Sequence, residues 1–253
     1  MAGLDPAIQP LSMLILKKSG WPGQARPWRV GERGTISSVR ALLGMQRKPE
    51  KNDILNLELE AFPETLDQAR KQAAHCRRCP LYLNATQTVF GEGPSHALVM
   101  FVGEQPGDKE DIIGRPFVGP AGKLFDRMLE EAGVDREKCY VTNAVKHFKN
   151  EPRGKFRLHK KPNASEVDAC RWWFKIEREL VRPKLFVALG ATAALTLTGN
   201  GRDILKRRGS FEADDDGTPV LITVHPSSLL RTTDADDAAM ARSAFRHASR
   251  KLP

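Results

Sequence analysis

Four short apolar segments alternate along the chain with stretches whose pattern predicts helices. Each apolar segment has the length of a strand buried on both faces. Strands are predicted at residues 97–102, 140–145, 185–189 and 220–224, and helices at residues 64–74, 121–132, 164–181, 191–197 and 234–250. This alternation is typical of a parallel sheet with helices on both faces. We therefore predict an α/β fold, a three-layer α/β/α sandwich around a four-stranded parallel sheet.

The first 60 residues lack this periodicity. Prolines interrupt any helix there, and basic residues outnumber acidic ones. We expect residues 1–60 to be a poorly organised basic N-terminal extension, and residues 61–253 to form one domain. The extension could be a basic tail, the remnant of another domain or an over-extended start.

Residues 143–162 are strongly basic. Seven cations stand there against the single acid Glu151: Lys146, Lys149, Arg153, Lys155, Arg157, Lys160 and Lys161. Clustered cations release counterions from a nucleic-acid backbone, although a solvated basic loop would have the same composition. The whole chain has a formal net charge of +9, which favours a polyanion, with nucleic acid first and an anionic membrane second. No apolar run reaches the 18 or so residues that a membrane span needs.

Polar side chains follow the predicted strands at the edge where parallel sheets bind ligands. Glu104 follows the first strand, Asn143 lies near the end of the second, and His225 follows the fourth. Phe117 lies in the loop after the first strand, where its ring could stack on a flat ligand. The loop has no Gly-x-Gly-x-x-Gly spacing and no Walker A lysine, which disfavours a dinucleotide or nucleoside triphosphate site.

Several motifs occur in series from Cys76 onward. They are Cys76-x-x-Cys79-Pro80-Leu81, Val89-Phe90-Gly91-Glu92-Gly93, Gly103-Glu104-Gln105-Pro106-Gly107-Asp108, Gly114-Arg115-Pro116-Phe117-Val118-Gly119-Pro120-Ala121-Gly122, Thr142-Asn143-Ala144-Val145-Lys146 and His225-Pro226-Ser227-Ser228-Leu229-Leu230-Arg231. Together they resemble the uracil-DNA glycosylase superfamily, close to family 4, from about residue 64 onward. The segment Lys155-Phe156-Arg157-Leu158-His159 is similar to the signature of the UdgX class, which traps its product covalently.

The resemblance implies a base excision repair enzyme that breaks the N-glycosidic bond of deoxyuridine in DNA. By similarity, Phe117 stacks on a flipped uracil, Asn143 binds its edge, and His225 donates to a carbonyl oxygen where negative charge develops. The residues expected to bind substrate are Gln105, Gly107, Asp108, Phe117, Asn143, Ser227 and Arg231. Leu229 or Leu230 would be the apolar wedge that enters the DNA.

The resemblance to the UdgX class implies that His159 attacks the sugar in place of water, which makes the enzyme single-turnover. We expect Glu104 to orient the imidazole ring, and Arg157 to fasten the segment to a phosphate or to the fold. Phe156 replaces an arginine usual in that class, which removes one charge, and Leu158 replaces a common isoleucine. The alternatives are a conventional family 4 glycosylase that uses water, and a non-catalytic module that binds damaged DNA.

Four cysteines, two of them in a Cys-x-x-Cys pair, indicate a metal or cluster site and not a disulfide framework. Family 4 proteins hold a 4Fe-4S cluster on four cysteines. Cys76, Cys79 and Cys170 match three of these positions, and His147 stands at the fourth. We expect this Cys₃His set to hold the cluster, with Cys139 as the competing ligand and zinc as the competing metal.

The resemblance also implies a partner and a location. We expect uracil-containing DNA, with single strands preferred, and no membrane partner. We further expect a cytoplasmic monomer that associates with the nucleoid when it acts.

Overall fold

The structure is a computed structural model that describes residues 62–230 and, beyond them, only Asp236, Ala239 and Ser243. The predicted extension at residues 1–60 and most of the helix predicted at residues 234–250 lie outside the described residues, and so does Arg231.

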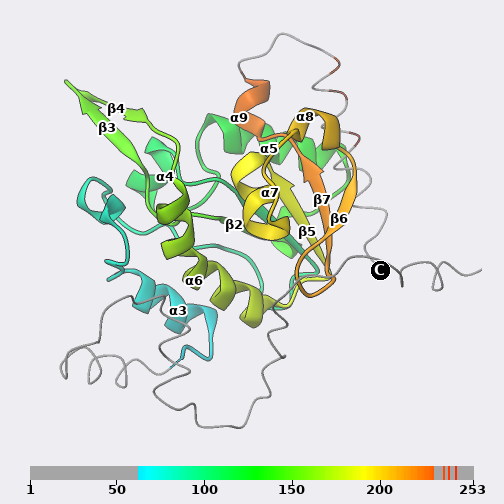
Figure 1. Ribbon diagram of the computed structural model, residues 1–253, viewed down its shortest axis with the longest axis horizontal. Helices are drawn as coiled ribbons and strands as arrows, with labels where there is room; N and C mark the ends of the chain where they lie inside the picture. The colour runs from blue at the N-terminus through cyan, green and yellow to red at the C-terminus, as the bar shows by residue number, and fades with distance from the viewer. Residues whose placement is uncertain (1–61, 231–235, 237–238, 240–242, 244–253) are drawn as a thin grey trace, which may run out of the picture. The chain divides into compact units, whose positions relative to one another are not determined.

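A five-stranded sheet forms the centre of the domain (Figure 1). Its order is β2 (Tyr140–Asn143), β1 (Val99–Gly103), β5 (Leu185–Leu189), β7 (Pro219–Thr223) and β6 (Phe211–Ala213). The first four strands are parallel, which confirms the predicted parallel sheet. The fifth, β6, pairs antiparallel with β7 and was not predicted, because three residues are too few to show a strand pattern.

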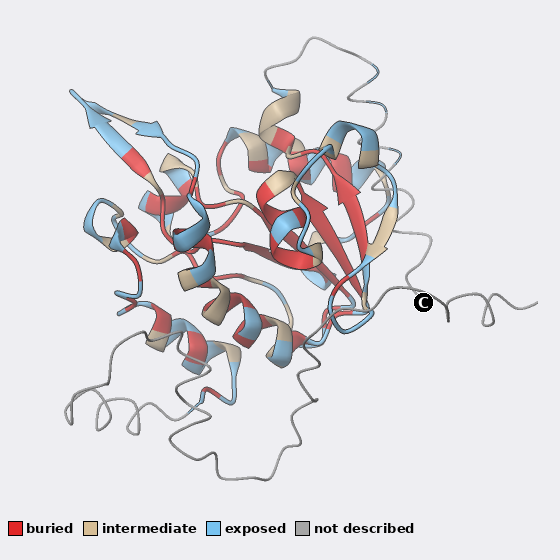
Figure 2. Ribbon diagram, in the orientation of Figure 1, coloured by how far each residue is buried: buried red, intermediate tan, exposed pale blue. Residues whose placement is uncertain are grey.

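Helices cover both faces of the sheet, which confirms the three layers. On one face, Val99 and Phe101 of β1 pack with Phe125 of α5 (Pro120–Glu131). On the other face, Met100 and Val102 pack with residues of α6 (Ala164–Val181) and α7 (Ala191–Thr198). Successive residues of a strand point to opposite faces, so one apolar run supplies both cores. Figure 2 shows these strands as almost entirely buried.

The helix bounds agree closely with the sequence pattern. Asn163 and Glu166 form a capping box that starts α6 at the predicted residue. Thr65 caps the first described helix. The remaining elements are α3 (Leu66–Ala73), η1 (Pro80–Leu83), α4 (Asp108–Ile113), η2 (Arg136–Lys138), β3 (Asn150–Arg153), β4 (Phe156–His159), α8 (Ile204–Arg207) and α9 (Pro226–Leu229).

The basic stretch is a β-hairpin and not the loop that its composition suggested. Strands β3 and β4 pair antiparallel, with Asn150 opposite His159 and Arg153 opposite Phe156. Gly154 makes the turn at a φ of +59°, a conformation that glycine adopts without strain. The hairpin projects from the body of the domain (Figure 1).

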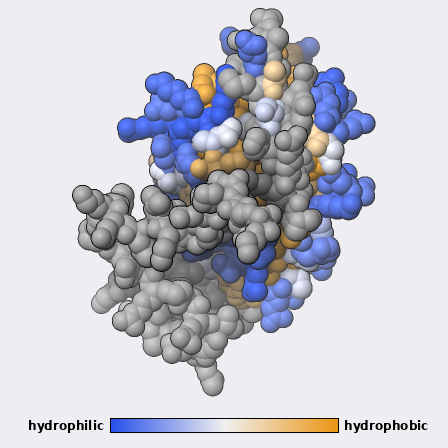
Figure 3. Space-filling model, turned by 90° about the vertical axis from the view of Figure 1, so that its right-hand side faces the viewer, coloured by the Kyte–Doolittle hydropathy of each residue, from blue (hydrophilic) through white to orange (hydrophobic). Residues whose placement is uncertain are grey.

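The open edge of the sheet at β6 lies on the side that Figure 3 turns toward the viewer. Hydrophilic side chains surround hydrophobic ones on the described part of this face. Polar surroundings of this kind discourage a sheet edge from pairing with another chain. Among the described residues, no helix is both long enough and apolar enough to cross a membrane.

Candidate active site

Gly103, Asn143 and Phe117 form the floor of the site. Gly103 and Asn143 end the neighbouring strands β1 and β2, where they are paired in register. A Cβ atom on Gly103 would lie 2.2 Å from Oδ1 of Asn143 and 2.8 Å from Cζ of Phe117, so no larger residue fits there. Oδ1 of Asn143 is buried and has no hydrogen-bond partner among the described residues. An unpaired buried amide oxygen is costly, which indicates that a ligand satisfies it.

His225 presents a hydrogen-bond donor to this region. It follows β7 and caps α9, and its Nδ1 accepts the backbone N–H of Ser227 at 3.1 Å. A backbone nitrogen can only donate, so the proton of the neutral ring lies on Nε2. The ring centre lies 5.8 Å from that of Phe117, so the two rings are neighbours.

Gln105 holds the ring of His159 at the base of the hairpin. Its Oε1 accepts the N–H of Lys149 at 2.9 Å, and its Nε2 donates to the carbonyl oxygen of Lys160 at 2.9 Å. These two contacts fix the orientation of the amide, so its second proton points to Nε2 of His159 at 2.7 Å. The imidazole nitrogen therefore accepts, and the neutral ring keeps its proton on Nδ1.

Glu104 lies near His159 without a hydrogen bond to its ring. Its Oε1 is 3.8 Å from Nε2 of His159, beyond hydrogen-bonding distance, while its Oε2 accepts the hydroxyl of Thr192 at 2.5 Å. In this structure the amide of Gln105 is the group that hydrogen-bonds to the ring nitrogen, and orientation of the ring by Glu104 stays a prediction. Glu104 remains close enough to stabilise a positive charge in the site.

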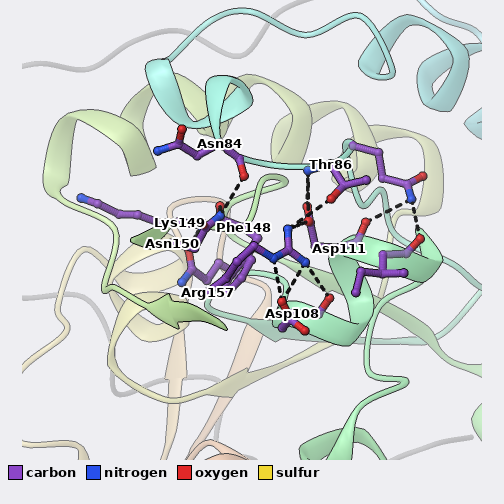
Figure 4. A network of polar contacts seen from close by, with 11 residues as sticks. Asn84, Thr86, Asp108, Asp111, Phe148, Lys149, Asn150 and Arg157 are labelled. Atoms are coloured by element: carbon purple, nitrogen blue, oxygen red, sulfur yellow. Dashed lines mark hydrogen bonds and ion pairs between the residues drawn. The ribbon is translucent and has the colours of Figure 1, made fainter. Parts of the chain in front are cut away.

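Arg157 fastens the hairpin to the fold (Figure 4). Its Nε donates to Oδ1 of Asp108 at 2.7 Å, and its Nη1 donates to Oδ2 of Asp111 at 2.5 Å. Asp111 is completely buried and also accepts the N–H of Thr86. Partial burial lowers the pKa of Arg157, but the carboxylates of Asp111 and Asp108 outweigh it and raise that pKa. Asp108, expected to line the substrate pocket, is thus paired with the hairpin.

Fewer cations of residues 143–162 are free to contact DNA than the sequence suggested. Lys146 has no exposed surface, and its Nζ lies 2.6 Å from Oε2 of Glu177. Counting it among DNA-facing cations was wrong, because the core surrounds it completely. Two further cations of the stretch are paired with acids, in the pairs Lys149–Glu166 and Lys160–Glu151.

Gly107 and Ser227, also expected to bind substrate, lie at the same edge, whereas Arg231 is outside the described residues. Gly107 precedes α4, where a Cβ atom would lie 2.6 Å from Oε2 of Glu110. The hydroxyl of Ser227 is 2.8 Å from Nδ1 of His225. Leu229 packs against the core, whereas the side chain of Leu230 is about half exposed.

Three cysteines and His147 surround one side of α6. Cys76, Cys79 and Cys170 belong to one buried cluster, and Sγ of Cys170 accepts the N–H of Lys146 at 3.1 Å. Burial raises the pKa of Cys170 to about 12 and also raises that of Cys79. Cys139 packs instead in the core on the α5 face, and its thiol donates to the carbonyl oxygen of Asp135 at 3.3 Å.

His147 has a buried nitrogen suited to a metal ligand. The hydroxyl proton of Thr88 goes to the carbonyl oxygen of Ala73 at 2.7 Å, so Thr88 can only accept from Nε2 of His147 at 3.1 Å. The lone pair of the neutral ring then lies on Nδ1, which is buried without a hydrogen-bond partner in the described part of the chain. A ligating histidine commonly donates its other N–H in this way. His147 and Cys76 also line one pocket of about 360 Å³.

No three His, Cys, Asp or Glu side chains within the described residues form a group that could hold a single metal ion. The donor set, three clustered thiols and an imidazole nitrogen without a hydrogen-bond partner in the described residues, has the chemistry of a ligand set for zinc or for an iron–sulfur cluster.

Four residues that were not predicted from the sequence make hydrogen bonds that hold the segments and side chains described above in place. They are Thr86, Asp111, Glu177 and Thr192. Only Asp111 had a signal, since it lies one helical turn after Asp108, where both carboxylates can reach one guanidinium.

Several known proteins are similar to this chain in sequence. A family model described as the uracil DNA glycosylase superfamily matches residues 90–249. A type-4 uracil-DNA glycosylase of Thermotoga maritima is 39% identical over 169 residues, which cover 66% of this chain and 84% of that protein. One of Sulfurisphaera tokodaii is 33% identical, over 66% of this chain and 76% of that protein. A type-5 uracil-DNA glycosylase of Pyrobaculum aerophilum is 28% identical, over 64% of this chain and 83% of that protein. The chain belongs to the uracil DNA glycosylase superfamily, and within it lies close to family 4.

Proposed function

We propose that this protein excises uracil from DNA in base excision repair and that His159 then captures the abasic sugar covalently. The family and the names of its relatives support uracil excision. One observation favours covalent capture over simple hydrolysis: Nε2 of His159 is an unprotonated acceptor beside Glu104, at the edge of the sheet where the base would bind. A neutral imidazole with an unprotonated nitrogen is a competent nucleophile.

Base recognition follows from the floor of the site. The ring of Phe117 offers a stacking surface, and the amide of Asn143, with its unpaired Oδ1, can accept from the N–H on the uracil edge. When the bond between C1′ and the base nitrogen breaks, its electron pair leaves with uracil. Nε2–H of His225 can donate to the carbonyl oxygen that gains this negative charge.

Capture replaces water by the imidazole. The lone pair on Nε2 of His159 forms a bond to C1′ of the oxocarbenium ion, and the ring becomes a cation. The ring returns to neutrality when the Nδ1 proton leaves to water. The Gln105 amide occupies the same lone pair at 2.7 Å, so this hydrogen bond must break as the sugar arrives. The carboxylate of Glu104 can stabilise the sugar cation in the meantime.

A denaturing gel tests the proposal. The protein is incubated with a single-stranded oligonucleotide containing one uracil, and free uracil is measured in parallel. We expect a protein–DNA band that survives boiling in detergent, with one uracil released per adduct. Free uracil without the band would identify a conventional glycosylase that uses water. If neither the band nor free uracil were detected, the protein would be a module that only binds damaged DNA.

We also propose that the protein acts as a monomer in the cytoplasm, associates with the nucleoid during repair, and prefers single-stranded DNA. An unpaired base costs less to move into a pocket than a stacked and paired one. Matched single-stranded and duplex oligonucleotides in the same assay test the preference.

A 4Fe-4S cluster on Cys76, Cys79, His147 and Cys170 completes the proposal. Its role would be structural, because these ligands join the chain before η1, the segment after β2 and helix α6. We expect a brown protein that absorbs at about 400 nm. Cys170→Ala should lose the colour and most of the iron, whereas Cys139→Ala should keep both, because Cys139 lies in the other core. A colourless, zinc-containing preparation of the unaltered protein would contradict the cluster.

Arg157→Lys should slow capture. Lysine keeps the charge but cannot donate to Asp108 and Asp111 at once, so the hairpin and His159 lose their fixed position. We expect adduct formation at saturating protein to slow by roughly tenfold or more, a typical effect of misplacing a reacting group. Arg127→Lys is the matched control, since Arg127 is exposed on α5, outside the hairpin. Equal rates for the two variants would show that the anchor is not needed.

A further inference from the structure

The face of the hairpin that points away from His159 carries two exposed apolar side chains beside the charged Arg153 and Glu151. Side chains alternate along β4, so Arg157 and His159 share one face and Phe156 and Leu158 share the other. Arg157 holds the first face against the domain. On the opposite face, Phe156 is 65% exposed and Leu158 is 37% exposed. Figure 2 shows most of the hairpin as exposed.

Two cations lie beside this aromatic ring, and a third follows the hairpin in the chain. Arg153 lies directly opposite Phe156 in the hairpin register, and Nζ of Lys155 lies 5.5 Å from the centre of the Phe156 ring. Lys161 follows the hairpin and is also exposed. None of these three cations has an ion pair within the part of the chain that the structure describes. An exposed aromatic ring with cations around it is the combination that binds single-stranded nucleic acid, by base stacking and by phosphate contacts.

The spacing along β4 relates this ring to the captured sugar. Phe156 and His159 are three residues apart in an extended strand, which separates their Cα atoms by about 10 Å, and their side chains point to opposite faces. Successive nucleotides advance by about 3.4 Å in a stacked strand and by more in a stretched one. A DNA strand that passes from His159 around the hairpin would therefore reach this ring at about one to three nucleotides from the uracil.

We propose that Phe156 stacks on a base of the same DNA strand, one to three nucleotides from the uracil, while Arg153 and Lys155 bind the adjoining phosphates. This inference rests on the proposed function, because the position of the DNA is taken from His159. A second copy of the chain is a poorer occupant, since the same cations would face each other across the contact. The hairpin would then carry the nucleophile and also bind the DNA strand that contains the uracil.

Oligonucleotides with missing bases test the inference. One uracil is kept, and a base-free spacer replaces each neighbouring nucleotide in turn up to three positions on either side. The affinity of the first, non-covalent complex is obtained from the concentration dependence of the capture rate. For the unaltered protein, we expect one spacer position to weaken binding by roughly 5- to 150-fold, the range for loss of one stacked base. Spacers at the other positions should have much smaller effects.

The variant Phe156→Ala should lower the affinity for the intact oligonucleotide by the same factor and lose its dependence on that spacer position. Phe156→Trp should restore both, because indole stacks at least as well as phenyl. Leu83→Ala is the control, since Leu83 is also largely exposed but lies outside the hairpin. At saturating protein, all four proteins should form the same amount of adduct.

The outcomes separate the inference from the proposed function. No uracil release and no adduct from the unaltered protein would overturn the proposed function. Adduct formation with equal affinities for Phe156→Ala and the unaltered protein would overturn the inference alone. Self-association that Phe156→Ala abolishes, together with unchanged DNA affinity, would assign this face to a second copy and overturn the inference as well.

Discussion

The variant His159→Ala is expected to form no detergent-resistant band with uracil-containing DNA while it continues to release uracil. Alanine removes the nitrogen that would bond to C1′, but it leaves Phe117, Asn143 and His225 in place. The cavity left by the ring admits water, which can attack the same oxocarbenium ion. We expect adduct formation to fall at least ~100-fold, equivalent to roughly 2.7 kcal/mol in the barrier for capture.

Two measurements on the same samples separate capture from excision. Single-turnover reactions are divided between a denaturing gel, which measures the adduct, and a chromatographic assay for free uracil. His96→Ala is the matched control, because His96 is an exposed histidine on the segment before β1. It should behave like the unaltered protein in both assays.

A persistent band in His159→Ala would move the nucleophile to another residue. Loss of both the band and uracil release would instead give His159 a part in breaking the glycosidic bond. Gln105→Ala discriminates further, because it frees the Nε2 lone pair but also removes the contacts to the backbone of Lys149 and Lys160. Slower capture in that variant would show that positioning of the ring matters more than release of its lone pair.

The parallel sheet and the residues at its edge could be predicted because the sequence encodes them locally. Each buried strand is a continuous apolar run, and the carboxyl ends of parallel strands meet at one edge whatever the loops do. This reasoning alone brought Asn143 and His225 together with Glu104. The structure adds which atoms face one another, including the proton on Nε2 of His225.

The hairpin could not be predicted because its own residues favour it only weakly. Strand β3 consists of Asn150, Glu151, Pro152 and Arg153, none of which is a strong strand former. The hairpin is held by contacts to distant residues, above all those of Arg157 and Gln105. The spacing of cations along the sequence does not show which of them pairs with a buried carboxylate and which is exposed to solvent.

Lys146 is the clearest example of a cation whose burial the sequence does not show. Its ammonium group donates to Oε2 of Glu177 at 2.6 Å, to Oγ1 of Thr142 at 2.7 Å and to the carbonyl oxygen of Asn143 at 2.6 Å. Neither charged side chain has any exposed surface. Removing one partner of such a pair leaves an uncompensated charge in the core, which costs about 3–5 kcal/mol.

The variant Lys146→Met is therefore expected to lose much of the ~5–15 kcal/mol by which a typical domain is stable. For a domain of this size, the midpoint of thermal unfolding should fall by roughly 6–20 °C. Lys149→Met is the matched control: Lys149 also pairs with a glutamate, at 2.8 Å, but its side chain is 25% exposed. We expect the control to lose no more than about 1 kcal/mol.

The double variant Lys146→Met, Glu177→Gln distinguishes loss of the charge pair from loss of packing. Neutral glutamine removes the uncompensated charge and can still bond with the hydroxyl of Tyr140 and with that of Thr142, so part of the lost stability should return. Uracil release should recover less, because Nζ of Lys146 also holds the backbone carbonyl of Asn143, whose side chain would bind the base. If Lys146→Met proved no less stable than Lys149→Met, the buried pair would not be a main support of the site.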